Sequence, residues 1–467
     1  MAIHAVTTTL FPSPCAIQVN FAVSNAKVSC VEGHPFLVSS TNEGTNEPNG
    51  YIQIVTLVTI EDYDLVIEAR RYARPIELAV LGVLSYLSGC VFAVSDRVLS
   101  QSTVIDEPPL DVNSSSQSPE LIVNGADMSN DVKLILNNID NIENRSTIIS
   151  LIDRWRRSRF LLLGSVDRLH HEEAFLGFFH ILELLLTEYD KQHRAHDSQQ
   201  IDTFVNEFLQ KNRFLRVQKF RDDKSLKIKS IKEIFMPSGM VPASTRIHYM
   251  IEKMGILELR THRLITDLVE VRNELAHGRF TFRQGMVWPL APFFSIISQH
   301  SCLTEILDVF TARVIALHYG IGAWEMEWNA VLDELHPPYD VIKLFVMDGR
   351  YNSISREDFQ QGRIDNVRPS SIADAFLQRK LKLTEAEQAL RTYLHSINDA
   401  SELDFDLIQL VLALGDAADS TLANHCRALF NSVHPDAFGI IDRRDILRFV
   451  EDRGFEIVWI KSTSNSS

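Results

Sequence analysis

Arg272, Asn273 and His277 lie within six residues of one another, and their side chains suit acid–base chemistry on a phosphate. An imidazole has a pKa near neutrality, so it can both accept and release a proton. A guanidinium is permanently charged, and its planar fork matches two phosphate oxygens. A carboxamide can orient either group without changing the charge. We therefore predict three catalytic residues, with His277 as general acid or base and Arg272 stabilising the phosphate.

A helix predicted over Ile256–His277 must position these residues. Gly278 follows at the place where a left-handed C-terminal cap is common. On an ideal helix, Arg272 and His277 lie about 140° apart around the axis. A loosened last turn or a second copy of the chain could bring them together, which favours a site completed in a dimer. The apolar stripe that would pack this helix is Leu257, Leu264, Leu268, Val271 and Leu275.

Three further helices are predicted around this one, and four helices are enough for an antiparallel bundle. The first is apolar on nearly every side, as a central helix of a bundle should be. The predicted ranges are Glu172–Tyr189, Ile201–Lys211 and Cys302–His318.

The string from Arg272 to Gly278, at a helix end and after an apolar helix, resembles the R-x4-6-H motif of HEPN domains in its R-N-x-x-x-H form. Together with the helix over Glu172–Tyr189, it is similar to the ApeA-like HEPN group, which is associated with bacterial defence against phage. The resemblance covers residues 161–322. It implies a metal-independent endoribonuclease, active as a dimer in which Arg and His of two protomers face one another, with no cofactor and no metal.

Structural explanations for the same residues stay open. A histidine at a helix C-terminus is favourable simply because it interacts with the helix dipole. Arg272 could equally pair with a carboxylate on another helix, and Glu183 is one candidate. HEPN bundles can also lose activity, so a non-catalytic module for nucleic-acid or nucleotide binding and dimerisation is the alternative function.

A basic segment precedes the predicted catalytic helix. From Lys211 to Arg283 the chain has 16 Lys and Arg against 8 Asp and Glu, although its formal net charge is -15. Such a segment suits a phosphate track, and a solvated loop and helix face is the alternative interpretation. The residues predicted to bind substrate are Lys219, Arg221, Lys224, Lys227 and Lys229.

Other groups are weaker candidates. The pairs His170–His171 and His193–His196 have metal-ligand types but lack the spacing of zinc hydrolases, so surface positions are favoured. Residues 434–444 faintly resemble a segment of helix-hairpin-helix proteins, which leaves a DNA-processing role for the C-terminal region as a third hypothesis.

The composition is that of a multidomain, mainly α globular protein. The chain has 467 residues, of which 45% are hydrophobic and 23% are charged. Its five cysteines show no zinc spacing, and no secretion signal is recognised, so we expect a cytoplasmic protein. The uncharged run Leu78–Ser95 is interpreted as a buried helix leading into a strand, and not as a membrane span.

Four regions are expected along the chain. They are an N-terminal α+β domain that senses a trigger or regulates (1–130), the HEPN-like nuclease domain (131–330), a C-terminal helical domain (331–460) and a disordered tail (461–467). Strands are predicted at Ile52–Ile60 and Val91–Val98, with a helix between them that Pro75 breaks or kinks. We expect Gln101–Ser118 to be an exposed connection. The partners expected are an RNA substrate, a second copy of the chain, and a phage or cellular trigger.

Overall fold

The structure, a computed structural model, divides the chain into two compact units. The first comprises residues 1–241 and 300–329, and the second comprises residues 242–299 and 330–467. The residues that the structure describes are 2–10, 16–23, 25–31, 51–60, 66–92, 97–105, 118–164, 170–211, 228–232, 242–277, 301–434 and 443–460. Within these ranges, no helix is both long and apolar enough to cross a membrane.

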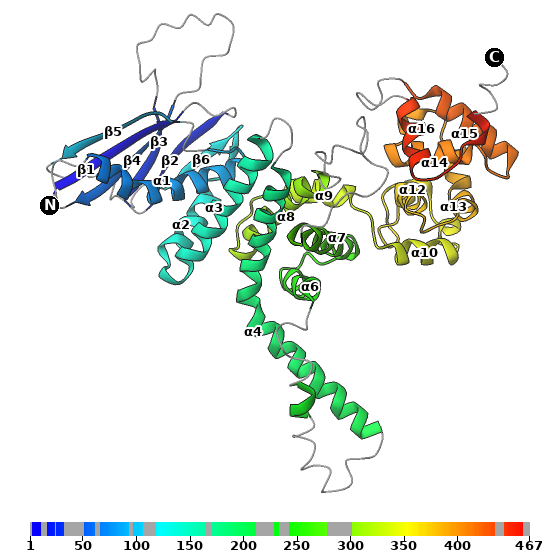
Figure 1. Ribbon diagram of the computed structural model, residues 1–467, viewed down its shortest axis with the longest axis horizontal. Helices are drawn as coiled ribbons and strands as arrows, with labels where there is room; N and C mark the ends of the chain where they lie inside the picture. Colours follow the sequence, from blue (N-terminus) through cyan, green and yellow to red (C-terminus); the bar gives the residue numbers. More distant parts are fainter. Residues whose placement is uncertain are drawn as a thin grey trace, which may run out of the picture. The chain divides into compact units, whose positions relative to one another are not determined.

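The first unit begins with a seven-stranded antiparallel sheet of order β5-β1-β4-β3-β2-β6-β7 (Figure 1). Its longest strands are rich in β-branched residues, which fit a pleated surface. The strand predicted at Ile52–Ile60 is confirmed as β4. The strands are β1 (Ala2–Leu10), β2 (Ile17–Val23), β3 (Ala26–Val31), β4 (Tyr51–Ile60), β5 (Arg97–Ile105), β6 (Glu120–Val123) and β7 (Ala126–Asp127).

Helix α1 (Val66–Ser88) packs on one face of this sheet (Figure 1). Val6, Val58, Ile60, Ala69 and Ala73 form a buried cluster between them. Of the two effects expected of Pro75, the break is wrong, because α1 runs as one helix through this residue, and the kink stays a prediction. Pro75 and Arg71, four residues earlier, are both exposed, so the Arg71 carbonyl that loses its partner can be solvated.

Two other N-terminal predictions are also corrected. Of the strand predicted at Val91–Val98, Val91 and Phe92 are not in a strand, residues 93–96 lie outside the described residues, and Arg97 and Val98 belong to β5. The first part of the expected connection Gln101–Ser118 belongs to β5, where it pairs with β1 along the edge of the sheet. Edge strands carry polar side chains that resemble those of loops, which explains the error. Residues 106–117 lie outside the described residues.

Three helices, α3 (Ile142–Gly164), α4 (His171–Lys211) and α8 (Ser301–His318), pack together in the first unit, and α1 packs against α3. Trp155 and Phe310 are fully buried among them. The Trp155 indole donates to the backbone carbonyl of Asp308 at 3.2 Å, and the Tyr86 hydroxyl of α1 donates to the Ala312 carbonyl at 2.7 Å. The first bond joins α3 to α8, and the second joins α1, which covers the sheet, to α8.

The prediction of a separate helix at Ile201–Lys211 is wrong, because α4 is continuous over 41 residues. Its polar middle, Asp190–Gln200, contains residues that favour helices, such as Lys, Gln, Arg and Ala, so it continues the helix. Figure 1 shows the second half of α4 extending beyond α3 and α8. Helix α2 (Ser129–Asp140) precedes α3, and α9 (Glu325–Glu334) crosses from the first unit into the second.

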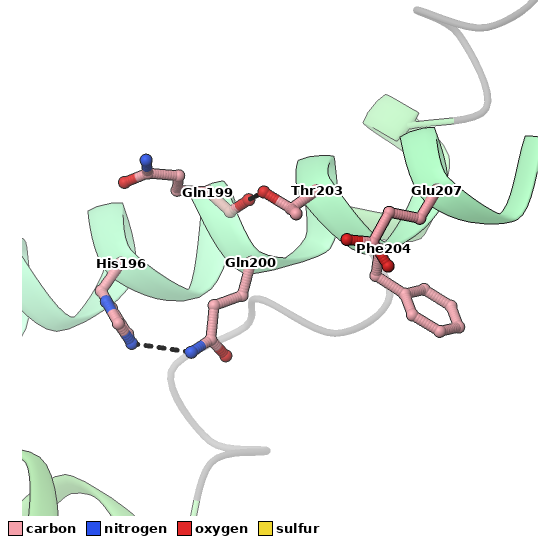
Figure 2. Close-up of a pocket in the computed structure, with 6 residues that line it drawn as sticks. All are labelled: His196, Gln199, Gln200, Thr203, Phe204 and Glu207. Atoms are coloured by element: carbon pink, nitrogen blue, oxygen red, sulfur yellow. Dashed lines mark hydrogen bonds between the residues drawn. The ribbon is translucent and has the colours of Figure 1, made fainter. Parts of the chain in front are cut away.

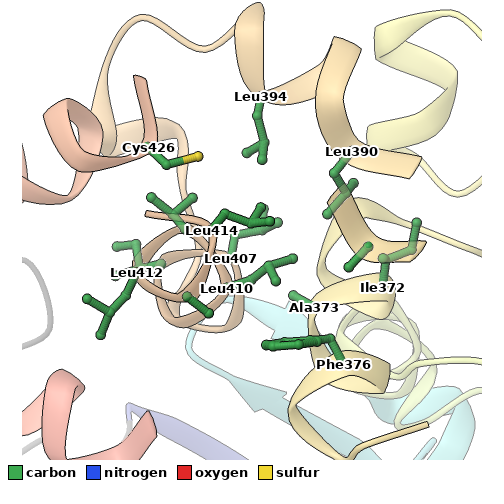
Figure 3. Close-up of a cluster of buried hydrophobic side chains, with 14 of the residues drawn as sticks. Ile372, Ala373, Phe376, Leu390, Leu394, Leu407, Leu410, Leu412, Leu414 and Cys426 are labelled. Atoms are coloured by element: carbon green, nitrogen blue, oxygen red, sulfur yellow. The ribbon is translucent and has the colours of Figure 1, made fainter. Parts of the chain in front are cut away.

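The second unit is helical where the structure describes it, and most of its buried side chains belong to one core. Figure 3 shows the centre of this core, where leucines of α14 are surrounded by Ile372 and Phe376 of α12 and by Leu390 and Leu394 of α13. The helices are α6 (Ala243–Lys253), α7 (Leu259–Ala276), α10 (Tyr339–Met347), α11 (Arg356–Gln360), α12 (Pro369–Leu377), α13 (Leu383–His395), α14 (Phe405–Leu414), α15 (Ser420–Ser432) and α16 (Arg443–Asp452), with 3-10 helices η3 (Arg350–Ser353) and η4 (Ala400–Glu402).

The described chain is therefore mostly helical, with an antiparallel sheet near its N-terminus, as expected. In the C-terminal region the sequence predicts helices at Ser371–Leu381, Thr384–Leu394, Leu407–Leu414 and Ser420–Ser432. Helices α12, α13, α14 and α15 confirm them, α15 with the predicted bounds. The predicted members of the HEPN bundle are divided between the two units, with α4 and α8 in the first and α7 in the second. The four-helix HEPN bundle and the three expected domains stay predictions, and the tail 461–467 lies outside the described residues.

Candidate functional site

Helix α7 carries the predicted catalytic residues, and local sequence explains where it begins. Glu258 and Thr261 form a reciprocal capping box, in which the Thr261 hydroxyl accepts from the Glu258 N–H at 2.8 Å. Thr261 is itself fully buried. The side chains that bury the helix are Leu264, Ile265, Leu268 and Val271, three of which were predicted.

The three predicted residues lie in the last turn and a half of α7. Arg272 is half-buried, and its Nη1 donates to the Oδ1 of the exposed Asn273 at 3.2 Å. His277 is exposed and forms the C-cap, with its N–H donating to the Asn273 carbonyl at 3.2 Å. The structure therefore joins the guanidinium to the carboxamide and leaves the imidazole open to solvent.

The last turn of α7 keeps its helical form before the histidine. Ala276 is the last helical residue, and His277 has φ -95° and ψ 6°. Because the turn is not unwound, the side chains of Arg272 and His277 should point about 140° apart around the axis, as on a regular helix. A regular last turn therefore does not bring the two side chains of one chain to the same side of the helix. Gly278 lies outside the described residues.

Sequence reasoning did not single out Glu274, which adjoins these residues. Its Oε2 atom is buried and has no hydrogen-bond partner among the described residues. A buried carboxylate oxygen without a donor is energetically unfavourable. Burial is a tertiary property, and no pattern in the sequence indicates it.

Only one of the predicted substrate-binding residues lies within the part of the chain that the structure describes. Lys219, Arg221, Lys224 and Lys227 lie outside the described residues. Lys229 is exposed on a short helix over residues 228–232, which belongs to the first unit. Lys232 of that helix contacts an Asp202 carboxylate of α4 at 2.8 Å. The phosphate track stays a prediction.

A second acid–base cluster lies in the first unit, where α8 ends on α4. The His318 Nε2 is 3.1 Å from a Glu188 carboxylate oxygen, and its Nδ1 is 3.2 Å from the Tyr189 hydroxyl. Carboxylate, imidazole and hydroxyl occur in this order in enzymes with an activated nucleophile. Burial, together with Glu188, raises the pKa of Tyr189, however, so its hydroxyl stays protonated at neutral pH. The cluster holds the end of α8 against α4.

A similar arrangement in the second unit is also structural. The Ser371 Oγ lies 3.2 Å from the His336 Nδ1, and the His336 Nε2 lies 3.6 Å from an Asp406 oxygen. Ser371 is completely buried, and its hydroxyl accepts the Arg368 N–H at 3.2 Å. A hydroxyl that no substrate can reach serves to cap α12.

Two histidines of α4 pair with side chains of the same helix. The expected surface position is wrong for His171 and His193, which are both buried. The His193 Nδ1 lies 3.5 Å from Asp197, and His196 lies 2.9 Å from Gln200. In the part of the chain that the structure describes, no three His, Cys, Asp or Glu side chains gather as metal ligands. A hollow of about 430 Å³ lies beside His196. Figure 2 shows its lining residues, which are His196, Gln199, Gln200, Thr203, Phe204 and Glu207. These residues all come from α4, so this hollow does not combine groups from different elements.

Comparison with protein-family models, curated proteins and solved structures finds no significant match to this chain.

Proposed function

We propose that this chain is a metal-independent endoribonuclease of the HEPN type that serves as an anti-phage defence or toxin effector. The observation that carries the proposal is the end of α7, where the exposed His277 follows the Arg272 guanidinium and its bonded partner Asn273 within five residues. This end combines a proton-transfer group with a phosphate-binding group, and it is open to solvent.

The chemistry needs only these side chains and the RNA itself. One imidazole accepts the proton of a ribose 2′-hydroxyl as that oxygen attacks the adjacent phosphorus, and the bond to the 5′-oxygen breaks. The leaving oxygen takes a proton from a general acid. Arg272 stabilises the charge on the non-bridging oxygens. The products are a 2′,3′-cyclic phosphate and a 5′-hydroxyl.

The proposal includes a homodimer. Arg272 of one protomer and His277 of another would meet over one phosphodiester, because a helical α7 directs them to different sides within one chain.

Substitutions at the two residues test the proposal. General acid–base catalysis is worth about 10² to 10⁴ in rate, so His277→Ala should reduce cleavage of single-stranded RNA by that factor without abolishing binding. Arg272→Ala should reduce it similarly, and Arg272→Lys should restore little, because a point charge does not replace the planar fork. The control is His170→Ala, an exposed histidine of the first unit.

Product analysis in a chelator separates this proposal from other mechanisms. We expect cleavage to persist in EDTA and to leave 2′,3′-cyclic phosphate ends. Full activity of either alanine variant, or a strict requirement for Mg²⁺, would overturn the proposal. RNA binding without cleavage by the wild-type dimer would instead support the non-catalytic HEPN module.

A further inference from the structure

Arg263, nine residues before Arg272 on α7, connects this helix to the C-terminal helices of the second unit. Its Nη2 lies 2.9 Å from an Asp374 oxygen of α12 and donates to the Tyr339 hydroxyl of α10 at 2.5 Å. Its Nη1 donates to the Pro337 carbonyl at 3.3 Å. The guanidinium also lies over the Tyr339 ring, 4.0 Å from its centroid. One side chain therefore contacts three separate positions beyond residue 330.

These contacts are largely removed from solvent. The side chains of Arg263 and Asp374 are only 17% and 14% exposed. A surface ion pair contributes little, but removing one partner of a buried pair leaves a charge without compensation and is strongly destabilising. We name Arg263, Asp374 and Tyr339 the α7 clamp.

A neighbouring arginine reinforces the attachment one turn earlier. The Arg260 Nη1 donates to the Leu332 carbonyl at 2.6 Å, and its Nε donates to Glu258 at 2.8 Å. Arg260 and Arg263 thus attach the beginning of α7 to residues 330–374. The other attachment of α7 is to α6, where the imidazoles of His248 and His262 stack with centroids 4.1 Å apart.

The helix transmits this attachment to its far end. His277 lies 14 residues after Arg263, or about 21 Å along a helix axis. Over that length a tilt of about 3° at the clamp moves the histidine by about 1 Å. A misplacement of about 1 Å in a catalytic group can lower a rate by about 10².

We propose that Arg263 is a positioning residue, and that the α7 clamp makes the C-terminal helical region the platform that fixes the Arg272–His277 end of α7. The catalytic part of this inference rests on the proposed function, whereas the mechanical part does not. It gives the C-terminal region a role that the sequence left open.

Two measurements on the full-length protein test the two parts separately. Hydrogen exchange of the amides of 264–277 reports whether α7 is held, and steady-state cleavage of a single-stranded RNA reports whether its end is positioned. The variants are Arg263→Gln, Asp374→Asn and Tyr339→Phe. Arg350→Gln is the matched control, because Arg350 is an exposed arginine of the same unit that pairs with Asp348 and Asp365.

In Arg263→Gln we expect the α7 amides to exchange about 10- to 100-fold faster than in the control, while the amides of α14 are unchanged. We expect kcat to fall about 10-fold or more with KM within about two-fold of wild type, because RNA binding does not need the clamp. Asp374→Asn should reproduce both effects. Tyr339→Phe should have smaller effects, since it keeps the ring under the guanidinium.

Each failure has a distinct meaning. Unchanged exchange of α7 in Arg263→Gln would overturn the clamp. Faster exchange with an unchanged kcat would overturn the positioning role. If the wild-type protein does not cleave RNA, the proposed function fails, and the exchange data still decide whether the C-terminal region holds α7. If kcat falls, KM rises and the amides exchange faster throughout the second unit, Arg263 is merely a structural residue.

Discussion

The residues at the end of α7 have unequal surroundings, and this difference assigns their roles. Arg272 is half-buried and bonded to Asn273, so its guanidinium is held in one orientation. His277 is exposed at the C-cap, where a substrate can reach its imidazole. The proposed cleavage by 2′-hydroxyl attack needs a held phosphate-binding group and an accessible proton-transfer group.

A different residue, Asp308 in the first unit, controls a pH-dependent part of the stability. Its carboxylate is paired with Arg159, whose guanidinium also lies over the rings of Trp155 and Trp324 at 5.2 and 5.3 Å. Burial raises the pKa of Asp308 to about 6 despite the favourable charge of Arg159. Because the folded pKa is above the unfolded value, this group stabilises the fold most at low pH, and the contribution is lost as pH rises through about 6.

Replacement of Asp308 by asparagine should therefore have a pH-dependent effect on stability. Near pH 4.5 the wild-type carboxyl is mostly neutral, so Asp308→Asn exchanges one neutral group for another of similar shape. Between pH 4.5 and 7.5 the free energy of unfolding of the wild type should fall by about 2 kcal/mol relative to that of Asp308→Asn, because only the wild type has a titrating group at this position. Urea unfolding at several pH values measures this. A difference that stays constant, or that changes in favour of wild type, would contradict the raised pKa of Asp308.

At the scale of elements, close backbone approaches fix how the helices pack. Gly415 ends α14, and a Cβ atom added there would overlap the indole of Trp459. That indole is held in place, because its Nε1 donates to the Leu412 carbonyl at 3.1 Å and its backbone N–H donates to Asp416 at 3.0 Å. Trp459 is therefore held both through its ring and through its backbone. It cannot easily move aside, so position 415 requires glycine.

Gly415→Ala should accordingly destabilise the second unit by about 1–3 kcal/mol, which is typical of overpacking. The loss should appear in urea unfolding, and Trp459 fluorescence should shift to longer wavelength as the ring is displaced. The control is the same substitution in a Trp459→Ala background. There the methyl group has room, so an equal loss of stability in both backgrounds would rule out the steric explanation.

At the scale of the whole molecule, the proposed active site requires two chains. If Arg272 of one protomer acts with His277 of the other, a dimer of one Arg272→Ala chain and one His277→Ala chain has one intact site and one doubly impaired site. If each chain makes its own site, both sites of the same dimer are impaired.

Mixing the two inactive variants distinguishes these arrangements. Co-expressed or refolded together in equal amounts, they should recover about a quarter of wild-type cleavage, since half of the dimers are mixed and each has one of two sites. The control is Arg272→Ala alone at the same total concentration, which should stay inactive. Absence of recovery, with mixed dimers demonstrated by differently tagged chains, would exclude a site shared between protomers.

Local features of the sequence were enough to predict many elements. The helix Ser420–Ser432 and the strand β4 were predicted well, because their caps, apolar spacing and β-branched residues act within a few positions of the chain. The candidate catalytic residues were likewise found by their types and by their place at a helix end, which is again a local property.

Only the tertiary structure decided which elements belong together. The buried ion pair between Arg263 and Asp374 joins positions more than a hundred residues apart and attaches α7 to the C-terminal helices, and no periodicity predicts such a contact. The unbroken course of α1 through Pro75 was decided in the same way, by burial of the apolar residues that follow it against the sheet and α3. Sequence alone determines local geometry, whereas long-range contacts depend on the burial and pairing of side chains that only the folded chain brings together.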